Sequence, residues 1–185
     1  MGMEREKMLA GELYQAWDPE LVDARAEAKT ALREINAAPG GDRGIIKAAL
    51  GRLLGAMGDE VWIEPPFQCD YGKNIYLGDG VYFNFNCVIL DGAKVEIGAR
   101  SLFGPHVQIY TASHPMDSGE RAKGLEFSKA ISIGTDVWVG GGAIILPGVK
   151  IGNRCVIGAG SVVTHDLPDD VLAAGNPCRV IRPVT

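Results

Sequence analysis

One histidine stands where a side chain could move a proton at neutral pH. His114 lies in the segment TASHP, and Glu126 follows within the same stretch, residues 111–130. An imidazole titrates near pH 7, so it can take the proton of a hydroxyl group as the oxygen attacks an electrophile. Glu126 could orient that imidazole, or its carboxylate could simply be solvated. A histidine in a surface loop can also have no chemical role, so its context must decide.

Composition limits the class of protein. The chain has 185 residues, 46% of them hydrophobic, and a net charge of −5, which suits one globular domain and argues against a nucleic-acid partner. The start MGMEREKMLA lacks the apolar run of a secretory signal, and no stretch approaches a membrane-spanning length. We therefore expect a cytoplasmic protein with no membrane partner. The cysteines form no CxxC pair and are expected to be reduced and buried: Cys69, Cys87, Cys155 and Cys178.

Outside residues 111–130, aliphatic and aromatic residues recur at an interval of six. In ISIGTDVWVGGGAIILPGVKIGNRCVIGAGSVV they are Ile133, Val139, Ile145, Ile151, Ile157 and Val163. Earlier, with one slip of two residues, they are Leu77, Phe83, Ile89, Ile97, Phe103 and Ile109. Such short repeats predict a parallel β-solenoid, in which each hexad forms one strand and one turn and stacked coils bury the repeated residues. The strands of an ordinary β-sandwich would not keep so constant an interval.

The stretch 111–130 interrupts this repeat and is predicted to be an inserted loop. A coil contacts only its neighbours, so an insertion at a corner leaves the stack intact and marks function more often than stability. Before the repeats, Asp18-Pro19-Glu20 predicts the start of a helix that ends near Pro39, and Asp42 is expected to cap a second helix that carries Met57. We expect a helical segment at 1–60, the solenoid at 61–166 and a tail at 167–185.

The hexads, with the pattern I-G-x-x-x-V/A/C/S, resemble those of the hexapeptide-repeat acyltransferases, whose fold is a left-handed parallel β-helix. GELYQAWDPEL, EPPFQCDYGKNIYLG, NFNCVILD, TASHP and AAGNPCRVIR are similar to segments of the maltose and galactoside O-acetyltransferases, over nearly the whole chain. The resemblance implies a mainly β protein that transfers an acetyl group from acetyl-CoA to a sugar hydroxyl. It also implies no metal requirement, and a homotrimer with active sites between subunits.

For catalysis, the resemblance assigns His114 as the general base and Asn84, in FNFN, as the group that stabilises the transition state. Acetyl transfer needs both groups. A positioned base raises the rate ~10²–10⁴-fold, and the oxyanion that develops on the carbonyl oxygen needs a hydrogen-bond donor. Glu126 is carried over as a third catalytic candidate. The galactoside enzymes have a methionine at this position, so the chain leans toward the maltose type.

For the acceptor, carboxylates and amides suit a polyol because they exchange hydrogen bonds with adjacent hydroxyls. The positions that match the family's acceptor site are Asp18, Asp70, Tyr82, Asn84 and Asp91. The galactoside enzymes have serine at the position of Asp70 and a second acid at that of Gly92, so the sugar is open. Aspartate also favours corners, so Asp70 and Asp91 could be turn residues, and the alignment around Asp18 can shift.

For acetyl-CoA, the last third of the chain is the net-positive part, with 7 basic and 5 acidic residues in 121–185. Arginine suits the phosphates, and Trp138 could lie against the pantetheine arm. The matched positions are Trp138, Gly141, Ala159, Thr164, His165, Arg179 and Arg182. The glycine could equally serve a tight corner, and the arginines could be solvated.

Three rival functions stay open at this level. A xenobiotic O-acetyltransferase would keep the fold and donor but act on an antibiotic hydroxyl. A metal lyase of the carbonic-anhydrase type would need His106, His114 and His165 to converge on zinc, and nothing aims the other two at His114. A purely structural solenoid would have no reason to break its repeat around a histidine.

Overall fold

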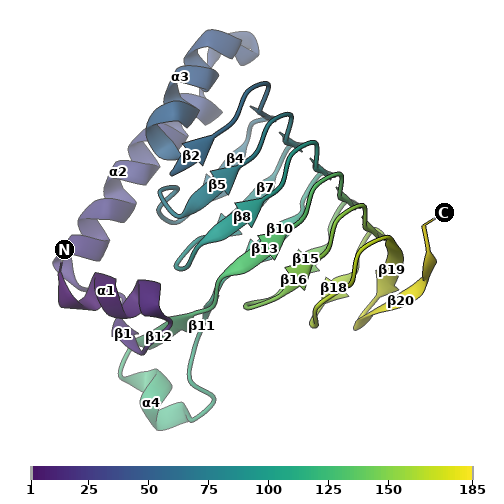
Figure 1. Cartoon of the computed structure of the whole chain (residues 1–185). Helices are drawn as coiled ribbons and strands as arrows, with labels where there is room; N and C mark the ends of the chain where they lie inside the picture. Colours follow the sequence, from purple (N-terminus) through teal and green to yellow (C-terminus); the bar gives the residue numbers. More distant parts are fainter. Residues whose placement is uncertain (1, 185) are drawn as a thin grey trace.

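Short parallel strands form the three sides of a β-solenoid of about six turns (Figure 1). The computed structural model describes residues 2–184. In each turn the chain passes along a first, a second and a third face, and then returns to the first. This arrangement confirms the mainly β hexapeptide-repeat fold that the six-residue interval predicts.

Each face is a parallel sheet whose strands come from successive turns. The first face contains β2 (Ala56–Met57), β5 (Ile75–Leu77), β8 (Val95–Ile97), β13 (Ile131–Ile133) and β16 (Lys150–Ile151). The second contains β3 (Trp62–Ile63), β6 (Tyr82–Phe83), β9 (Leu102–Phe103), β14 (Trp138–Val139), β17 (Val156–Ile157) and β19 (Val171–Gly175), with β20 (Cys178–Pro183) antiparallel at its edge. The third contains β4 (Phe67–Cys69), β7 (Cys87–Leu90), β10 (Gln108–Tyr110), β15 (Ile144–Ile145) and β18 (Val162–Val163).

The residues at the six-residue interval fill the inside of the coils. Every predicted position, from Leu77 to Val163, is at most 4% exposed. Near the middle, the rings of Phe83 and Phe103 stack with their centroids 4.1 Å apart and an interplanar angle of 10°. The four cysteines are buried and unpaired, as expected. Burial of apolar side chains from adjacent coils is therefore what holds the stack together.

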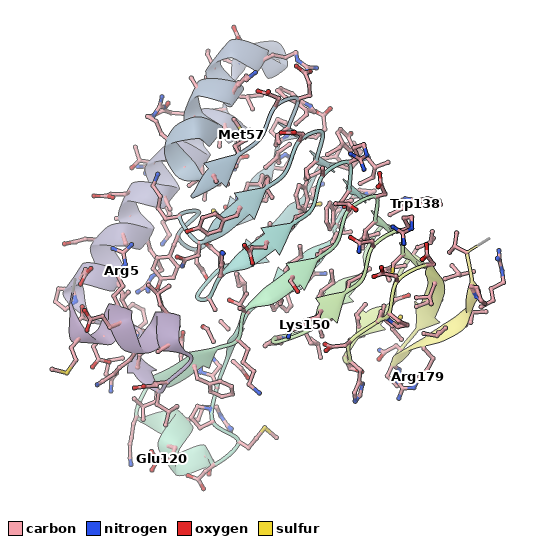
Figure 2. All side chains as sticks on the ribbon, viewed as in Figure 1. Arg5, Met57, Glu120, Trp138, Lys150 and Arg179 are labelled. Carbon is pink, nitrogen blue, oxygen red and sulfur yellow. The ribbon has the colours of Figure 1, made fainter. Side chains whose placement is uncertain are left out.

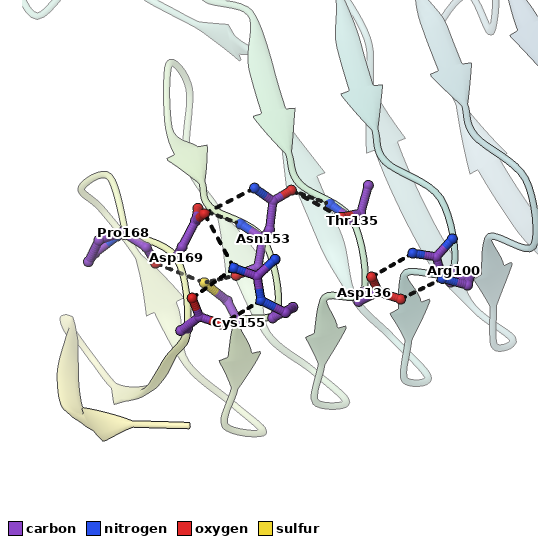
Figure 3. A network of polar contacts seen from close by, with 9 residues as sticks. Arg100, Thr135, Asp136, Asn153, Cys155, Pro168 and Asp169 are labelled. Carbon is purple, nitrogen blue, oxygen red and sulfur yellow. Dashed lines mark hydrogen bonds and ion pairs between the residues drawn. The ribbon is translucent and has the colours of Figure 1, made fainter. Parts of the chain in front are cut away.

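Polar contacts link successive coils at the corner between the first and second faces (Figure 3). Each turn places one residue there with a positive φ, including Arg100 at 58° and Arg154 at 56°. Arg100 pairs with Asp136 of the next coil (Nε–Oδ1 2.7 Å), and Arg154 pairs with Asp170 (Nε–Oδ1 2.5 Å). Because these pairs are exposed, they contribute little to stability, and the apolar interior is the main source.

The N-terminal segment combines helices with one short strand: α1 (Met3–Ala10), β1 (Tyr14–Gln15), α2 (Pro19–Asn36), η1 (Pro39–Gly41) and α3 (Arg43–Leu53). Asp18 caps α2 by accepting from Glu20 N at 3.0 Å, and Asp42 caps α3 by accepting from Gly44 N at 2.8 Å, both as predicted. The buried faces of α2 and α3 join the same hydrophobic core as the first coils. No helix among residues 2–184 is long and apolar enough to cross a membrane.

Two expected boundaries need correction. Met57 lies in β2 of the first coil, not in the second helix, so the solenoid starts at Ala56 and a boundary at residue 60 would cut its first turn. At the other end, β19 pairs in parallel with β17. Leu167 at the start of the tail bridges to Ile151 of the first face, so the tail adds strand residues to both faces at the end of the solenoid.

The stretch 111–130, called the insert below, leaves the solenoid between β10 and β13. It contains β11 (Ala112–Ser113), α4 (Ser118–Ala122) and β12 (Leu125–Ser128). β12 pairs antiparallel with β11 on one side and with β1 on the other, which makes a three-stranded sheet. Figure 1 shows α1, β1 and the insert gathered at this one corner. The insert is thus a folded element that the N-terminal segment holds in place.

Candidate active site

His114 is exposed and follows directly after β11. The pairing of Ser113 with Phe127 fixes the backbone beside it. Its Nδ1 lies 3.4 Å from the carbonyl oxygen of Leu125, on the opposite strand of the hairpin. With the proton on Nδ1 donated to that carbonyl, Nε2 carries the lone pair and faces away from the contact. The local fold therefore suits an imidazole that accepts a proton at Nε2.

Glu126 has a partner other than His114. It lies in β12 directly opposite Tyr14 of β1, and the Tyr14 hydroxyl donates to Glu126 Oε2 at 2.9 Å. Burial raises the pKa of Tyr14 above its usual range, which keeps the hydroxyl protonated and able to donate. Among the described residues no hydrogen bond joins Glu126 to the imidazole. The sequence left two alternatives for Glu126, that it orients His114 or that it is solvated. In the structure Glu126 is instead half-buried and hydrogen-bonded to Tyr14.

Asp91 needs correction as an acceptor ligand. Its side chain is 0% exposed, and Oδ1 accepts from the backbone N–H groups of Asp70 at 3.0 Å and Tyr71 at 2.9 Å. Oδ2 accepts from Asn74 N at 3.3 Å. Burial raises the pKa of Asp91 to about 7, although the bonds to Tyr71 and Asn74 lower it. A carboxylate so enclosed cannot reach a sugar, and its role is to fix the turn that carries Asp70.

Asp70 is half-buried at the same corner and has the character of a binding group. Burial raises the pKa of this carboxyl, the Arg25 guanidinium lowers it, and the Glu126 carboxylate raises it. Asp70 and Glu126 are therefore close enough to interact, although they are distant in sequence. The two carboxylates provide several hydrogen-bond acceptors for a hydroxylated ligand. The side chain of Asp18, by contrast, caps α2 by accepting a hydrogen bond from Glu20 N.

Arg25, from α2, organises this corner, and the sequence pattern did not single it out. Its Nη1 donates to the Tyr71 hydroxyl at 2.6 Å, and its Nη2 donates to the Ala16 carbonyl at 2.6 Å. Its guanidinium carbon lies 5.6 Å from the centroid of the Tyr71 ring and 5.9 Å from that of Trp17. The sequence offered only an indirect signal for this arginine, in the segments GELYQAW and CDYG, which contain Tyr14 and Tyr71. Without the fold, nothing in these segments indicates that their aromatic residues lie near Arg25.

Tyr82 lies in β6 of the second face, and Asn84 lies at the corner that follows, between the second and third faces. Asn84 Oδ1 accepts from the backbone N–H of Phe85 at 2.8 Å, which leaves its Nδ2 free to donate. The third face separates this corner from the insert, and four strand residues such as β7 span about 13 Å. A single chain therefore does not bring Asn84 to His114.

The candidate acetyl-CoA residues divide between two corners and the second face. Trp138 projects from the second face, 57% exposed, beside Leu102 of β9 and Val156 of β17. Arg179 and Arg182 are exposed on β20, where each donates to a backbone carbonyl of its own chain segment. Figure 2 shows Trp138 and Arg179 at the C-terminal end of the solenoid, away from Glu120 of the insert.

Gly141 and Ala159 share the corner of Asn84, in later coils. A Cβ at Gly141 would lie 3.1 Å from the Pro105 carbonyl oxygen, so a tight corner accounts for this glycine by itself. Thr164 and His165 lie at the corner between the third and first faces, where the insert leaves an earlier coil, with Thr164 Oγ1 2.8 Å from His165 Nδ1. His106 stands at the corner of Asn84, and in residues 2–184 no three His, Cys, Asp or Glu side chains gather as a metal site would need.

Comparison with known proteins identifies the family. Residues 7–58 match the model of the maltose acetyltransferase hexapeptide capping motif, and residues 130–165 match that of the bacterial transferase hexapeptide. A putative acetyltransferase of Saccharomyces cerevisiae is 51% identical over 181 residues, which cover 97% of this chain and 92% of that protein.

Two solved structures are similar along the whole chain. A maltose O-acetyltransferase from Clostridium difficile has a TM-score of 0.98 and 43% identity, and the match covers 100% of this chain and 98% of that one. A galactoside acetyltransferase in complex with coenzyme A has a TM-score of 0.96 and 37% identity, with 100% and 92% covered. The chain therefore belongs to the hexapeptide-repeat proteins and is an acetyltransferase of the maltose and galactoside O-acetyltransferase family.

Proposed function

We propose that the chain transfers an acetyl group from acetyl-CoA to a hydroxyl of a sugar of the maltose, glucose or galactoside type. The galactoside relative binds coenzyme A, which supports this donor. The Asp70 carboxylate, whose pKa both the Arg25 guanidinium and the Glu126 carboxylate affect, supports a polyhydroxylated acceptor. The observation that carries the proposal is the insert itself, which holds His114 with Nδ1 toward the Leu125 carbonyl and Nε2 free.

In the proposed reaction, Nε2 of His114 takes the proton of the acceptor hydroxyl while the hydroxyl oxygen attacks the carbonyl carbon of the acetyl thioester. The carbonyl oxygen becomes an oxyanion, which accepts a hydrogen bond from Nδ2 of Asn84. When the tetrahedral intermediate collapses, the carbon–sulfur bond breaks and the coenzyme A thiolate takes the proton back from the imidazole. No acetylated side chain is formed, so the buried cysteines take no part.

We propose further that the active enzyme is a homotrimer in which His114 of one subunit meets Asn84 of the next. The two residues lie at different corners of one chain, so a neighbour is needed to join them. The side chains that point outward from the faces support such an association. The second face presents Leu102 and Trp138, 47% and 57% exposed, whereas the first presents one aromatic residue, Tyr76, and then the polar residues Glu96, Ser132 and Lys150. Exposed apolar surface of this kind suits contact between subunits.

A mixing experiment tests the shared site. His114→Ala and Asn84→Ala subunits are each expected to be inactive alone, and co-expression with different tags allows mixed trimers to be purified. If each site takes His114 from one subunit and Asn84 from its neighbour, each purified mixed trimer has one complete site, so about a third of the wild-type activity returns. If the two residues act within one chain, no mixed trimer contains a complete site and activity is not restored.

Acetyl-CoA is proposed to lie along the second face, with its pantetheine arm against Trp138 and its phosphates toward the arginines of β20. Backbone at Gly141 and Ala159, and the pair Thr164 and His165 of a neighbouring subunit, complete the proposed cofactor site. Arg179→Ala and Arg182→Ala are expected to raise KM for acetyl-CoA without changing KM for the sugar. An equal rise in both constants would contradict this placement.

Release of free coenzyme A thiol tests the reaction. Wild type, His114→Ala and the control Glu120→Gln, an exposed change in the same insert, are compared with glucose, maltose, isopropyl-thiogalactoside and chloramphenicol. We expect sugar-dependent release in wild type and the control, and a loss of about 10²–10⁴-fold in His114→Ala. Release with chloramphenicol alone would favour the xenobiotic reaction. Full activity of His114→Ala would refute the assigned base.

A further inference from the structure

Trp17 is a largely exposed aromatic residue that the fold holds in place. It is 77% exposed, and among the large apolar side chains described only Met116 is more exposed. It lies between β1, which pairs with the insert, and the Asp18 cap of α2. Its backbone is thus fixed on both sides, and its exposure is not the result of a loose segment.

Groups from two elements support the indole ring. The Arg25 guanidinium carbon of α2 lies 5.9 Å from its centroid. On the side of the insert, Gly124 comes so close that a Cβ there would lie 3.9 Å from Trp17 Cδ1. Trp17 therefore bridges the helix that carries Arg25 and the insert that carries His114. A flat apolar surface is presented at the rim of the proposed acceptor site.

The surroundings indicate what this surface contacts. The Arg25 guanidinium carbon is 5.9 Å from the Trp17 centroid and 5.6 Å from the Tyr71 centroid, so Trp17 lies near the turn that carries Asp70 and Tyr71. The corner combines the half-buried Asp70 carboxylate and the Arg25 guanidinium with the exposed aromatic ring of Trp17. A carbohydrate combines hydroxyl groups with flat C–H faces, which suits such a site, because aromatic rings bind apolar faces while carboxylates bind hydroxyls.

We propose that Trp17 determines acceptor specificity by stacking against a second sugar unit, beyond the unit held at Asp70. This inference rests on the proposed sugar acceptor. It implies that the enzyme prefers disaccharides and longer glycosides to monosaccharides. The ring contacts the part of the acceptor that does not react, so it acts mainly on KM. A stacking contact of this size corresponds to about a tenfold change in KM.

Steady-state kinetics with glucose, maltose and maltotriose tests the proposal. We compare wild type, Trp17→Ala, Trp17→Phe and the control Leu13→Ala, an exposed apolar residue of the same segment. Trp17→Ala is expected to raise KM for maltose and maltotriose about tenfold and to change KM for glucose less than twofold, with kcat unchanged. Trp17→Phe and Leu13→Ala are expected to keep most of the preference, and thermal melts check that all variants fold.

The outcomes separate the two proposals. If none of the sugars increases thiol release by the wild type, the proposed function fails and this inference fails with it. If wild type accepts sugars but Trp17→Ala keeps the preference for maltose, or loses glucose to the same degree, only the role of Trp17 is refuted. Fluorescence gives a readout independent of turnover. Maltose should shift the emission of a Trp62→Phe protein, and that shift should be absent when Trp17 is also changed to Phe.

Discussion

Replacement of Asp91 should destabilise the protein strongly although no ligand contact is lost. The carboxylate is fully buried and accepts N–H bonds at 3.0, 2.9 and 3.3 Å. In Asp91→Ala these three backbone donors lose their partner, and each unsatisfied buried group costs about 1–3 kcal/mol. The three donors together cost on the order of 3–9 kcal/mol, and the 3.3 Å bond from Asn74 N contributes least. Asp91→Asn keeps an acceptor oxygen and the side-chain volume, so it should lose less.

The effect of Asp91 should also depend on pH, with a defined sign. Its pKa is raised from 3.8 in the unfolded chain to about 7 in the folded protein. Between these values the folded state binds more protons than the unfolded state, so stability falls as pH rises. The contribution is fully present below about pH 4 and is lost above pH 7. Between pH 5 and 7.5 the calculated loss is about 2.5 kcal/mol.

Urea unfolding of wild type and Asp91→Asn at several pH values measures this contribution. The protein concentration is held constant, because association would otherwise change the apparent stability. The free energy of unfolding of wild type minus that of the variant should decrease by about 2 to 3 kcal/mol from pH 5 to 7.5. A difference that is constant with pH would show that Asp91 keeps one charge state throughout. A difference that increases would show that hydrogen bonding outweighs burial.

Three further predictions concern the parts that position the site. Tyr14→Phe removes the bond to Glu126, so it should cost about 1–2 kcal/mol and speed amide exchange in β12, and unchanged exchange there would contradict it. Phe83→Ala leaves a cavity beside Phe103 and should lower unfolding stability by about 3–5 kcal/mol in urea. Ser101→Ala leaves a buried N–H without its acceptor and should cost about 1–3 kcal/mol by the same measurement, so a neutral effect would refute that reasoning.

The solenoid could be predicted because one physical constraint repeats along it. Each coil must bury its inward residues against the next coil, so the six-residue interval carries the same information many times. The insert was visible for the converse reason, as a break in that interval. Its internal structure was not visible, because the pairing of β1 with β12 joins residues more than a hundred positions apart and leaves no local period.

The two aspartates show where residue type stops being informative. Asp70 and Asp91 lie at the same corner of successive coils, 21 residues apart, and each is a reasonable turn residue or sugar ligand in the sequence. Only packing separates them, because Asp91 points into the turn of the coil before it while Asp70 stays partly accessible. Asn84 and His114 pose the complementary case, since the sequence predicts that both act in catalysis but they lie at different corners of the chain.

The N-terminal segment has two structural roles, to cover the end of the solenoid and to support the insert. α2 and α3 bury their apolar faces against the first coils, which covers the end of the solenoid as any stack of repeats requires. α1 and β1 contribute little to that cover, since Met8 and Tyr14 belong to a separate apolar cluster with Tyr71. β1 instead adds a third strand to the hairpin of the insert, and a two-stranded hairpin alone is only marginally stable in water. The geometry around His114 therefore depends on β1, nearly a hundred residues earlier in the chain and within the residues that match the capping motif.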